Sequence, residues 1–154
     1  MRTTVSFPPI ETLIPHEGGM VLIDKVLTYS SESIEVLITK QASSIVALES
    51  GEVPAWVGIE YMAQAVSAFA GLRALEKSTV IKKGYLLGSN RYRAYCDTFP
   101  AADPLVVKAN QSLLDESGVS IFDCQLLFGE TVLAEAAIKA IQPEDDELIK
   151  RGLS

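Results

Sequence analysis

One stretch of the sequence, residues 54–75, constrains the fold more than any other. Its last 20 residues carry only two charged side chains, Glu60 and Arg73, and its small residues fall on every side of a helix. A helix that is apolar all round is buried all round. Pro54 suits a helix start, because the first turn has no use for the N–H that proline lacks. The sequence therefore predicts a long central helix wrapped by a sheet.

Two polar side chains, Glu60 and Gln64, lie one turn apart on the same face of this predicted helix. A stretch of this length could span a bilayer, but Glu60, Gln64 and Arg73 would each be costly there and no second span follows. We therefore predict no membrane span. Two interpretations of Glu60 remain open: a solvated acid that complements the helix dipole, or a buried functional carboxylate.

Composition limits the classes of function. A chain of 154 residues is long enough for one domain with a real core, which we place at residues 1–143, before a charged tail at 144–154. The net charge of −7 argues against nucleic acid and anionic membranes as partners. Cys96 and Cys124 have neither metal-ligand nor disulfide spacing, and we expect buried free thiols in strand-like runs. The N-terminus has no apolar signal-peptide core, so we expect a cytoplasmic protein.

The remaining sequence is rich in strand patterns. Residues 20–29 and 34–39 read as a hairpin before the helix, and about four strands joined by short turns follow it. Gly84 and Gly88 are expected bulge or kink sites in the long run at 79–95. Hairpin-length turns make the predicted sheet mostly antiparallel, with an α+β fold class and 5–6 strands. One helix cannot cover both faces of this sheet, so we expect a dimer.

Candidate chemistry is limited to few residues. His16 is the only histidine and lies in a loop rich in Gly and Pro. It is either a surface or capping residue or a group that titrates near neutral pH. Metal-ligand spacings and a serine-nucleophile motif are absent from the sequence, so we predict no metal site. A glutamate beside the free N–H groups of a helix start suits acid–base work on a carbonyl compound.

Three segments resemble the 3-hydroxyacyl-acyl-carrier-protein dehydratases of the hotdog fold. Residues 14–26, I-P-H-E-G-G-M-V-L-I-D-K-V, are similar to the family's I-P-H-R-x-P-x-L-L-V-D-R-V segment. Residues 53–65, V-P-A-W-V-G-I-E-Y-M-A-Q-A, are similar to its F-P-G-V-L-x-x-E-A-M-A-Q helix start, and 85–93 to the strand after the helix. The I-P-H-x-G-x-M form resembles most closely the divergent dehydratase subunits of aryl polyene clusters.

The resemblance fails at two positions of the family's active site, and the first is the more important. Where the family has its catalytic histidine, in an H-F-P-G segment, this chain has Val46, and Ala55 replaces the glycine whose N–H helps to hold the thioester. Either His16 has become the base, or a homologous subunit supplies a histidine across a dimer interface.

The resemblance implies a hotdog enzyme that dehydrates 3-hydroxyacyl thioesters to trans-2-enoyl thioesters. Its substrate is carried on the phosphopantetheine of acyl carrier protein, and no separate cofactor is expected. Glu60 would be the general acid and His16 the base, with the substrate bound by four residues of the helix start, Ala55, Trp56, Val57 and Gly58, and by Gln64. Gln64 would orient the departing water or bond across the dimer.

The partners that the resemblance implies are acyl carrier protein and a second hotdog subunit, in a homodimer, a heterodimer or a higher oligomer. Arg91 and Arg93, two apart on a predicted strand, could dock the carrier protein, or they could protect an edge strand by charge. Two other functions stay open. One is a hotdog acyl thioesterase, and the other is a non-catalytic or site-sharing subunit of a heteromeric dehydratase.

Overall fold

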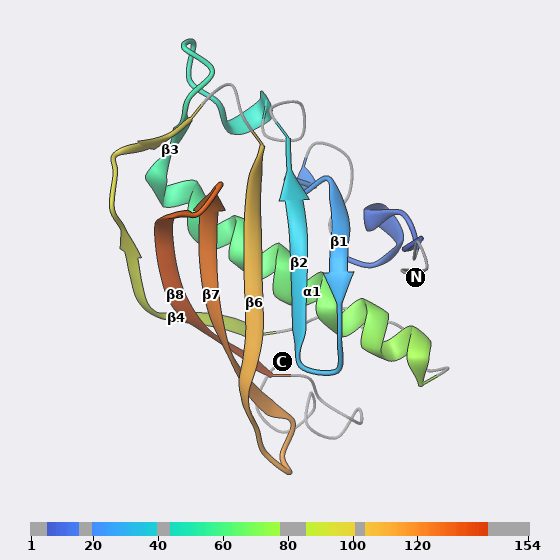
Figure 1. The fold of residues 1–154 in the computed structure, drawn as a ribbon. Coiled ribbons are helices and arrows are strands. Elements are labelled where there is room, and N and C mark those ends of the chain that lie inside the picture. Colours follow the sequence, from blue (N-terminus) through green and yellow to red (C-terminus); the bar gives the residue numbers. More distant parts are fainter. Residues whose placement is uncertain (1–5, 16–19, 40–43, 78–85, 101–103, 142–154) are drawn as a thin grey trace.

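The central helix predicted from the sequence crosses one face of an antiparallel sheet. The computed structural model describes residues 6–15, 20–39, 44–77, 86–100 and 104–141. Helix α1 (Gly58–Glu76) runs obliquely over the sheet, and its C-terminal end extends past the edge formed by β1 (Figure 1). The predicted α+β class, with one long helix and a mostly antiparallel sheet, is confirmed.

The main sheet has six strands, and two of its pairings, β2 with β6 and β8 with β4, join strands that are not consecutive in the sequence. In spatial order the strands are β1 (Lys25–Tyr29), β2 (Ser33–Ile38), β6 (Leu105–Leu114), β7 (Val119–Phe128), β8 (Thr131–Ile141) and β4 (Leu86–Ala94). Every one of these pairings is antiparallel. The expected hairpin before the helix is therefore confirmed, and β1 and β4 form the two edges.

Short elements connect this sheet to the helix. Strand β3 (Val53–Pro54) pairs with β5 (Thr98–Phe99) just before the helix start. The 3-10 turns are η1 (Ile10–Thr12), η3 (Ser44–Val46) and η4 (Ala55–Val57), and η4 leads directly into α1. Among the described residues, no helix is both long enough and apolar enough to cross a membrane.

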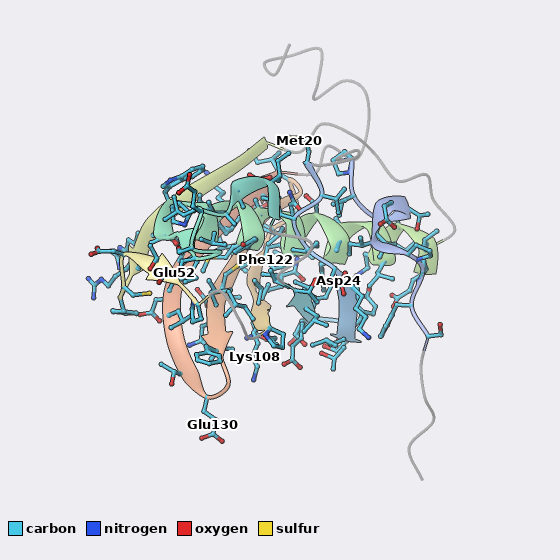
Figure 2. All side chains as sticks on the ribbon, turned by 90° about the horizontal axis from the view of Figure 1, so that it is seen from above. Met20, Asp24, Glu52, Lys108, Phe122 and Glu130 are labelled. Atoms are coloured by element: carbon cyan, nitrogen blue, oxygen red, sulfur yellow. The ribbon has the colours of Figure 1, made fainter. Side chains whose placement is uncertain are left out.

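The core lies between α1 and the sheet. Alternation along β2 directs Ile34, Val36 and Ile38 toward the helix, and all three side chains are buried. Phe122 of β7 lies between the two layers (Figure 2), with its ring centroid 5.2 Å from that of Phe69 in α1. The open face of the sheet carries the Lys108–Glu35 ion pair at 3.7 Å.

Gly71 allows the backbone at Leu13 to approach the helix closely. A Cβ at this position would collide with the backbone carbonyl of Leu13, just after η1. The segment that precedes β1 therefore packs directly on the helix backbone, and Leu13 is completely buried.

Several local predictions were wrong in their boundaries. The helix predicted from residue 54 begins at Gly58, because the turn before it is the tighter 3-10 form. The strand predicted over residues 20–29 begins only at Lys25. The N–H of Leu22 points to Gln64 of the helix instead of to a neighbouring strand.

The second half of the chain also differs from the prediction in detail. Gly88 pairs regularly with Lys139, and the bulge in β4 lies between Asn90 and Arg93. The region after β4, expected to be a turn, contains β5, and Cys96 lies in a bend instead of a strand. Gly84 and the tail at 144–154 lie outside the described residues.

Candidate functional site

The polar spot expected near the helix start is present at the first turn of α1. Glu60 is the third residue of the helix and is half-buried. Pro54 precedes η4 with φ of −56°, the value its ring imposes, and this directs the chain into the helix. A carboxylate at this position lies beside N–H groups of the first turn that have no partner within the helix.

Gln64 connects Glu60 to a segment far away in the sequence. Its side chain is completely buried. Nε2 donates to a Glu60 carboxylate oxygen at 3.0 Å and to the carbonyl of Met20 at 2.8 Å. Oε1 accepts the N–H of Leu22 at 2.8 Å. The amide thus fixes the position of the Glu60 carboxylate against the segment that enters β1, using bonds within one chain.

The segment held by Gln64 covers the helix on the side away from the sheet. Figure 2 shows Met20 on this side of the molecule, opposite Lys108 of the open sheet face. The Met20 side chain is 60% exposed. Residues 16–19, which include the candidate base His16, come immediately before it and lie outside the described residues.

The turn that was expected to bind substrate contains both buried and solvent-exposed residues. Val57 and Gly58 are buried, whereas Trp56 is 68% exposed and Ala55 is half-buried. This turn forms η4 and the first residue of α1. It therefore presents a large apolar ring to solvent beside a buried backbone.

Tyr92 of β4 makes direct contact with this turn. Its hydroxyl donates to the backbone carbonyl of Ala55. A Cβ at Gly58 would collide with the Tyr92 hydroxyl oxygen and would come within 3.1 Å of the Phe99 ring. Burial, followed by the effect of Cys96, raises the pKa of Tyr92 to about 12, so the hydroxyl keeps its proton and donates at neutral pH.

Comparison with known proteins identifies the family. The family model described as ApeP dehydratase, ApeP-like, matches residues 8–150. The chain belongs to the ApeP-like dehydratase family. A 3-hydroxyacyl-[acyl-carrier-protein] dehydratase FabZ of Chlamydia trachomatis serovar L2 is 27% identical over 146 residues, covering 91% of this chain and 94% of the relative.

Solved structures support the fold of this ApeP-like dehydratase. A chain of the dehydratase heterocomplex ApeI:P from Xenorhabdus doucetiae superposes with a TM-score of 0.85 at 27% identity, covering 94% of this chain and 97% of that one. A mutant of the phenylacetic acid degradation protein PaaI from Thermus thermophilus gives a TM-score of 0.53 at 11% identity, covering 77% and 92%. The second likeness concerns the fold alone. The predicted resemblance to hotdog dehydratases is confirmed.

In this ApeP-like dehydratase, Tyr92 is a site residue that was not predicted from the sequence. Arg91 and Arg93, which were predicted, lie on either side of it, and both of their side chains are exposed. Alternation along a strand places the residue between two exposed positions on the opposite face, toward the helix. That signal indicates the face of the strand on which Tyr92 lies, but not its contact with Ala55, which depends on the bulge at Arg91.

The described residues hold no group of three or more His, Cys, Asp or Glu side chains that could bind a metal ion. Cys124 is buried within β7, and burial, followed by the nearby Asp123, raises its pKa to about 12. Cys96 is only partly buried, so the expectation of two buried thiols holds for one of them.

Proposed function

We propose that this chain removes water from 3-hydroxyacyl thioesters carried on acyl carrier protein, with Glu60 as the general acid. The family makes the chain a dehydratase, of the kind that serves fatty-acid or aryl polyene synthesis. The observation that carries the role of Glu60 is its bond to Gln64, which holds a carboxylate in one orientation beside the helix start.

The reaction divides between a base, an acid and a set of donors. A base removes the proton from the α-carbon, and backbone N–H groups stabilise the enolate-like thioester oxygen. The bond between the β-carbon and its hydroxyl then breaks. The hydroxyl takes a proton from Glu60 and leaves as water, and the trans-2-enoyl thioester remains. No further cofactor is needed in this scheme, because the substrate brings its own phosphopantetheine arm.

The turn Ala55–Gly58 is the proposed thioester site. Trp56 is exposed enough to contact an arriving phosphopantetheine arm. The N–H of Ala55 donates to the carbonyl of Asp97 and that of Gly58 to the carbonyl of Ala55, so the N–H groups of Trp56 and Val57 are the ones proposed to bind the thioester oxygen. Arg91 and Arg93 are exposed on the edge strand β4 and are proposed to meet the carrier protein.

His16 remains the proposed base of the isolated chain. Gln64 holds the carbonyl of Met20 next to Glu60, and Met20 follows His16 by four residues. Four residues of extended chain reach about 14 Å at most. The bond between Gln64 and Met20 therefore limits how far His16 can lie from the acid.

A heteromeric site is the second candidate function. The sequence has Val46 where a dehydratase histidine is expected, and a similar chain belongs to a complex described as a dehydratase heterocomplex. We propose that this chain, too, pairs with a second hotdog subunit, which then supplies the histidine while this chain supplies Glu60.

We propose the cytoplasm as the site of the reaction.

Replacement of Glu60 by Gln tests the acid. We expect Glu60→Gln to lower kcat by about 100-fold or more, because the amide cannot donate a proton to the leaving hydroxyl. The measurement is formation of the enoyl thioester from a 3-hydroxyacyl carrier protein. Glu130→Gln, in the turn far from the helix (Figure 2), is the matched control and should keep its full rate. If Glu60→Gln keeps near-full turnover, Glu60 is not the acid.

Co-purification and product analysis separate the alternatives. The chain purified alone, as a homodimer with full activity, would exclude the site-sharing subunit. A one-to-one heteromer with activity that neither chain has alone would favour it. Release of a free carboxylic acid and a thiol, in place of the enoyl thioester, would instead indicate a thioesterase.

A further inference from the structure

An irregularity in the edge strand β4 directs one tyrosine at the helix start. Between Asn90 and Arg93 the register with β8 shifts, so that two residues, Arg91 and Tyr92, face one residue of the partner strand. Arg91 has φ of 62°, and it is the only described residue other than glycine with a positive φ. Such a conformation is costly for arginine and tends to persist where it has a function. A bulge of this kind re-aims the side chains next to it.

The re-aimed side chain fits a space that one glycine leaves open. The Tyr92 hydroxyl lies where a Cβ of residue 58 would lie, and it donates to the carbonyl of Ala55. The tyrosine therefore contacts both ends of the turn Ala55–Gly58. A Cβ at residue 58 would also come within 3.1 Å of the ring of Phe99, which is fully buried in β5. Tyr92 itself is half-buried, so its ring and its hydroxyl are both held against this turn.

We infer that Tyr92 is a positioning residue of the dehydratase site, which holds the turn Ala55–Gly58 so that the N–H groups of Trp56 and Val57 face the thioester. This inference rests on the proposed function of that turn. The N–H groups of Ala55 and Gly58 donate to the carbonyls of Asp97 and Ala55. The bond from Tyr92 holds the Ala55 carbonyl on its own side of the turn, which leaves the N–H groups of Trp56 and Val57 to face the substrate. Gly58 is required because any larger residue would displace the hydroxyl.

This arrangement explains three features together that otherwise have no common cause. The strained Arg91 provides the bulge, the bulge aims Tyr92, and Gly58 leaves room for its hydroxyl. A buried tyrosine hydroxyl needs a hydrogen-bond partner in any role, but filling the core would require neither the positive φ of Arg91 nor the missing side chain at position 58. Because a misplaced reacting group can cost two orders of magnitude in rate, the effect of losing this contact should appear in kcat.

The experiment is a set of four proteins assayed in whichever assembly, homomeric or heteromeric, is active: wild type, Tyr92→Phe, Gly58→Ala and the double variant. We expect Tyr92→Phe to lower kcat by about 10-fold with little change in KM, because the phenylalanine keeps the ring and loses the donor. Gly58→Ala should lower kcat by about 100-fold, since the added methyl group displaces the Tyr92 hydroxyl. The double variant should be more active than Gly58→Ala, because the colliding oxygen is gone.

Tyr95→Phe is the matched control on the same side of the molecule. Its hydroxyl bonds Glu135 on the surface and does not touch the turn, so the rate should be unchanged. A Tyr92→Phe variant with full kcat, or a double variant no better than Gly58→Ala, would overturn the role of Tyr92 while leaving the dehydratase intact. A wild-type protein that forms no enoyl product in any assembly would overturn the proposed function and this role with it.

Discussion

The two ends of α1 hold their polar side chains in opposite ways. At the N-terminal end, Gln64 is completely buried, and it donates to Glu60 and Met20 while it accepts from Leu22. Every polar atom of this amide has a partner. The network is complete and links the helix to a segment more than 40 residues away.

At the C-terminal end, the polar groups are paired incompletely. Arg73 donates to the carbonyl of Ser31, and its guanidinium carbon lies 5.0 Å from the centre of the Phe69 ring. Its Nε and the hydroxyl of Tyr29 are buried, and neither makes a hydrogen bond within the part of the chain that the structure describes. The C-terminal end of the helix is therefore stabilised by side-chain packing more than by hydrogen bonds.

This difference distinguishes the N-terminal end of α1, the proposed functional site, from the C-terminal end, which we expect to contribute to stability alone. A complete buried network allows one arrangement of its members and keeps a catalytic group in place, whereas an incomplete one costs stability and fixes little. We therefore expect substitutions at the N-terminal end to change both activity and stability, and substitutions at the C-terminal end to change stability alone. The three predictions below test this contrast.

Gln64→Leu should have the largest effect on stability. The variant leaves the buried N–H of Leu22 without a partner, which costs about 1–3 kcal/mol, and it removes the bond to Met20, which contributes about 1 kcal/mol. We expect the free energy of unfolding to fall by roughly 2–4 kcal/mol. Because Glu60 also loses its orienting donor, kcat should fall in the same variant. Urea unfolding and a rate assay at a temperature where the variant is folded measure the two effects.

Gln111→Leu is the control for the same chemical change elsewhere. Gln111 is half-buried in β6, and its side chain donates to Ser120 at 3.0 Å. Loss of this one bond should cost about 1 kcal/mol or less and leave kcat unchanged. If the two leucine variants were equally stable and equally active, the network at the helix start would have no special role.

The fold was predictable from the sequence where a pattern was long enough to repeat. The helix, the hairpin before it and the strands at 105–141 each carry several turns or alternations of apolar residues. Strands β3 and β5 have two residues each, too few to show any period. The late start of β1 could not be predicted, because the bond that replaces strand pairing comes from Gln64, 42 residues later.

The candidate site was likewise predictable where its contacts are local in the sequence, and not where they are long-range. Glu60 and Gln64 follow from helical spacing, and their bond at 3.0 Å is the contact which that spacing favours. The contact of Tyr92 with Ala55 joins residues that are 37 apart in the sequence. The positive φ at Arg91 could not be predicted, because arginine is not a residue type that favours it. Long-range contacts of this kind depend on how the elements pack.

Arg73→Met should have an intermediate effect that is confined to stability. Methionine keeps most of the apolar contact with Phe69 but loses the cation–π interaction and the bond to the Ser31 carbonyl. We expect a loss of about 1–2 kcal/mol in the free energy of unfolding, with kcat unchanged. Lys77→Met, an exposed cation one turn further along, is the control and should change stability by about 0.5 kcal/mol at most. A large drop in kcat for Arg73→Met alone would extend the site to the far end of the helix.

Tyr29→Phe should have the smallest effect, and it is the counterpart of Tyr92→Phe. The Tyr29 hydroxyl is buried without a hydrogen bond in the described part of the chain, so its removal should change stability by about 1 kcal/mol at most, toward greater stability, and leave kcat unchanged. Burial, followed by the nearby Glu76 carboxylate, raises the pKa of Tyr29 in the folded protein, although the geometry places no hydrogen bond on its hydroxyl within the described residues, and folding therefore favours the neutral phenol. The wild type should therefore lose stability as the pH rises above about 10, and the phenylalanine variant should lose less. Thermal unfolding at pH 8 and pH 11 measures this difference. A marked loss of stability at pH 8 would mean that the hydroxyl does bind a partner, and the contrast between the two helix ends would then fail.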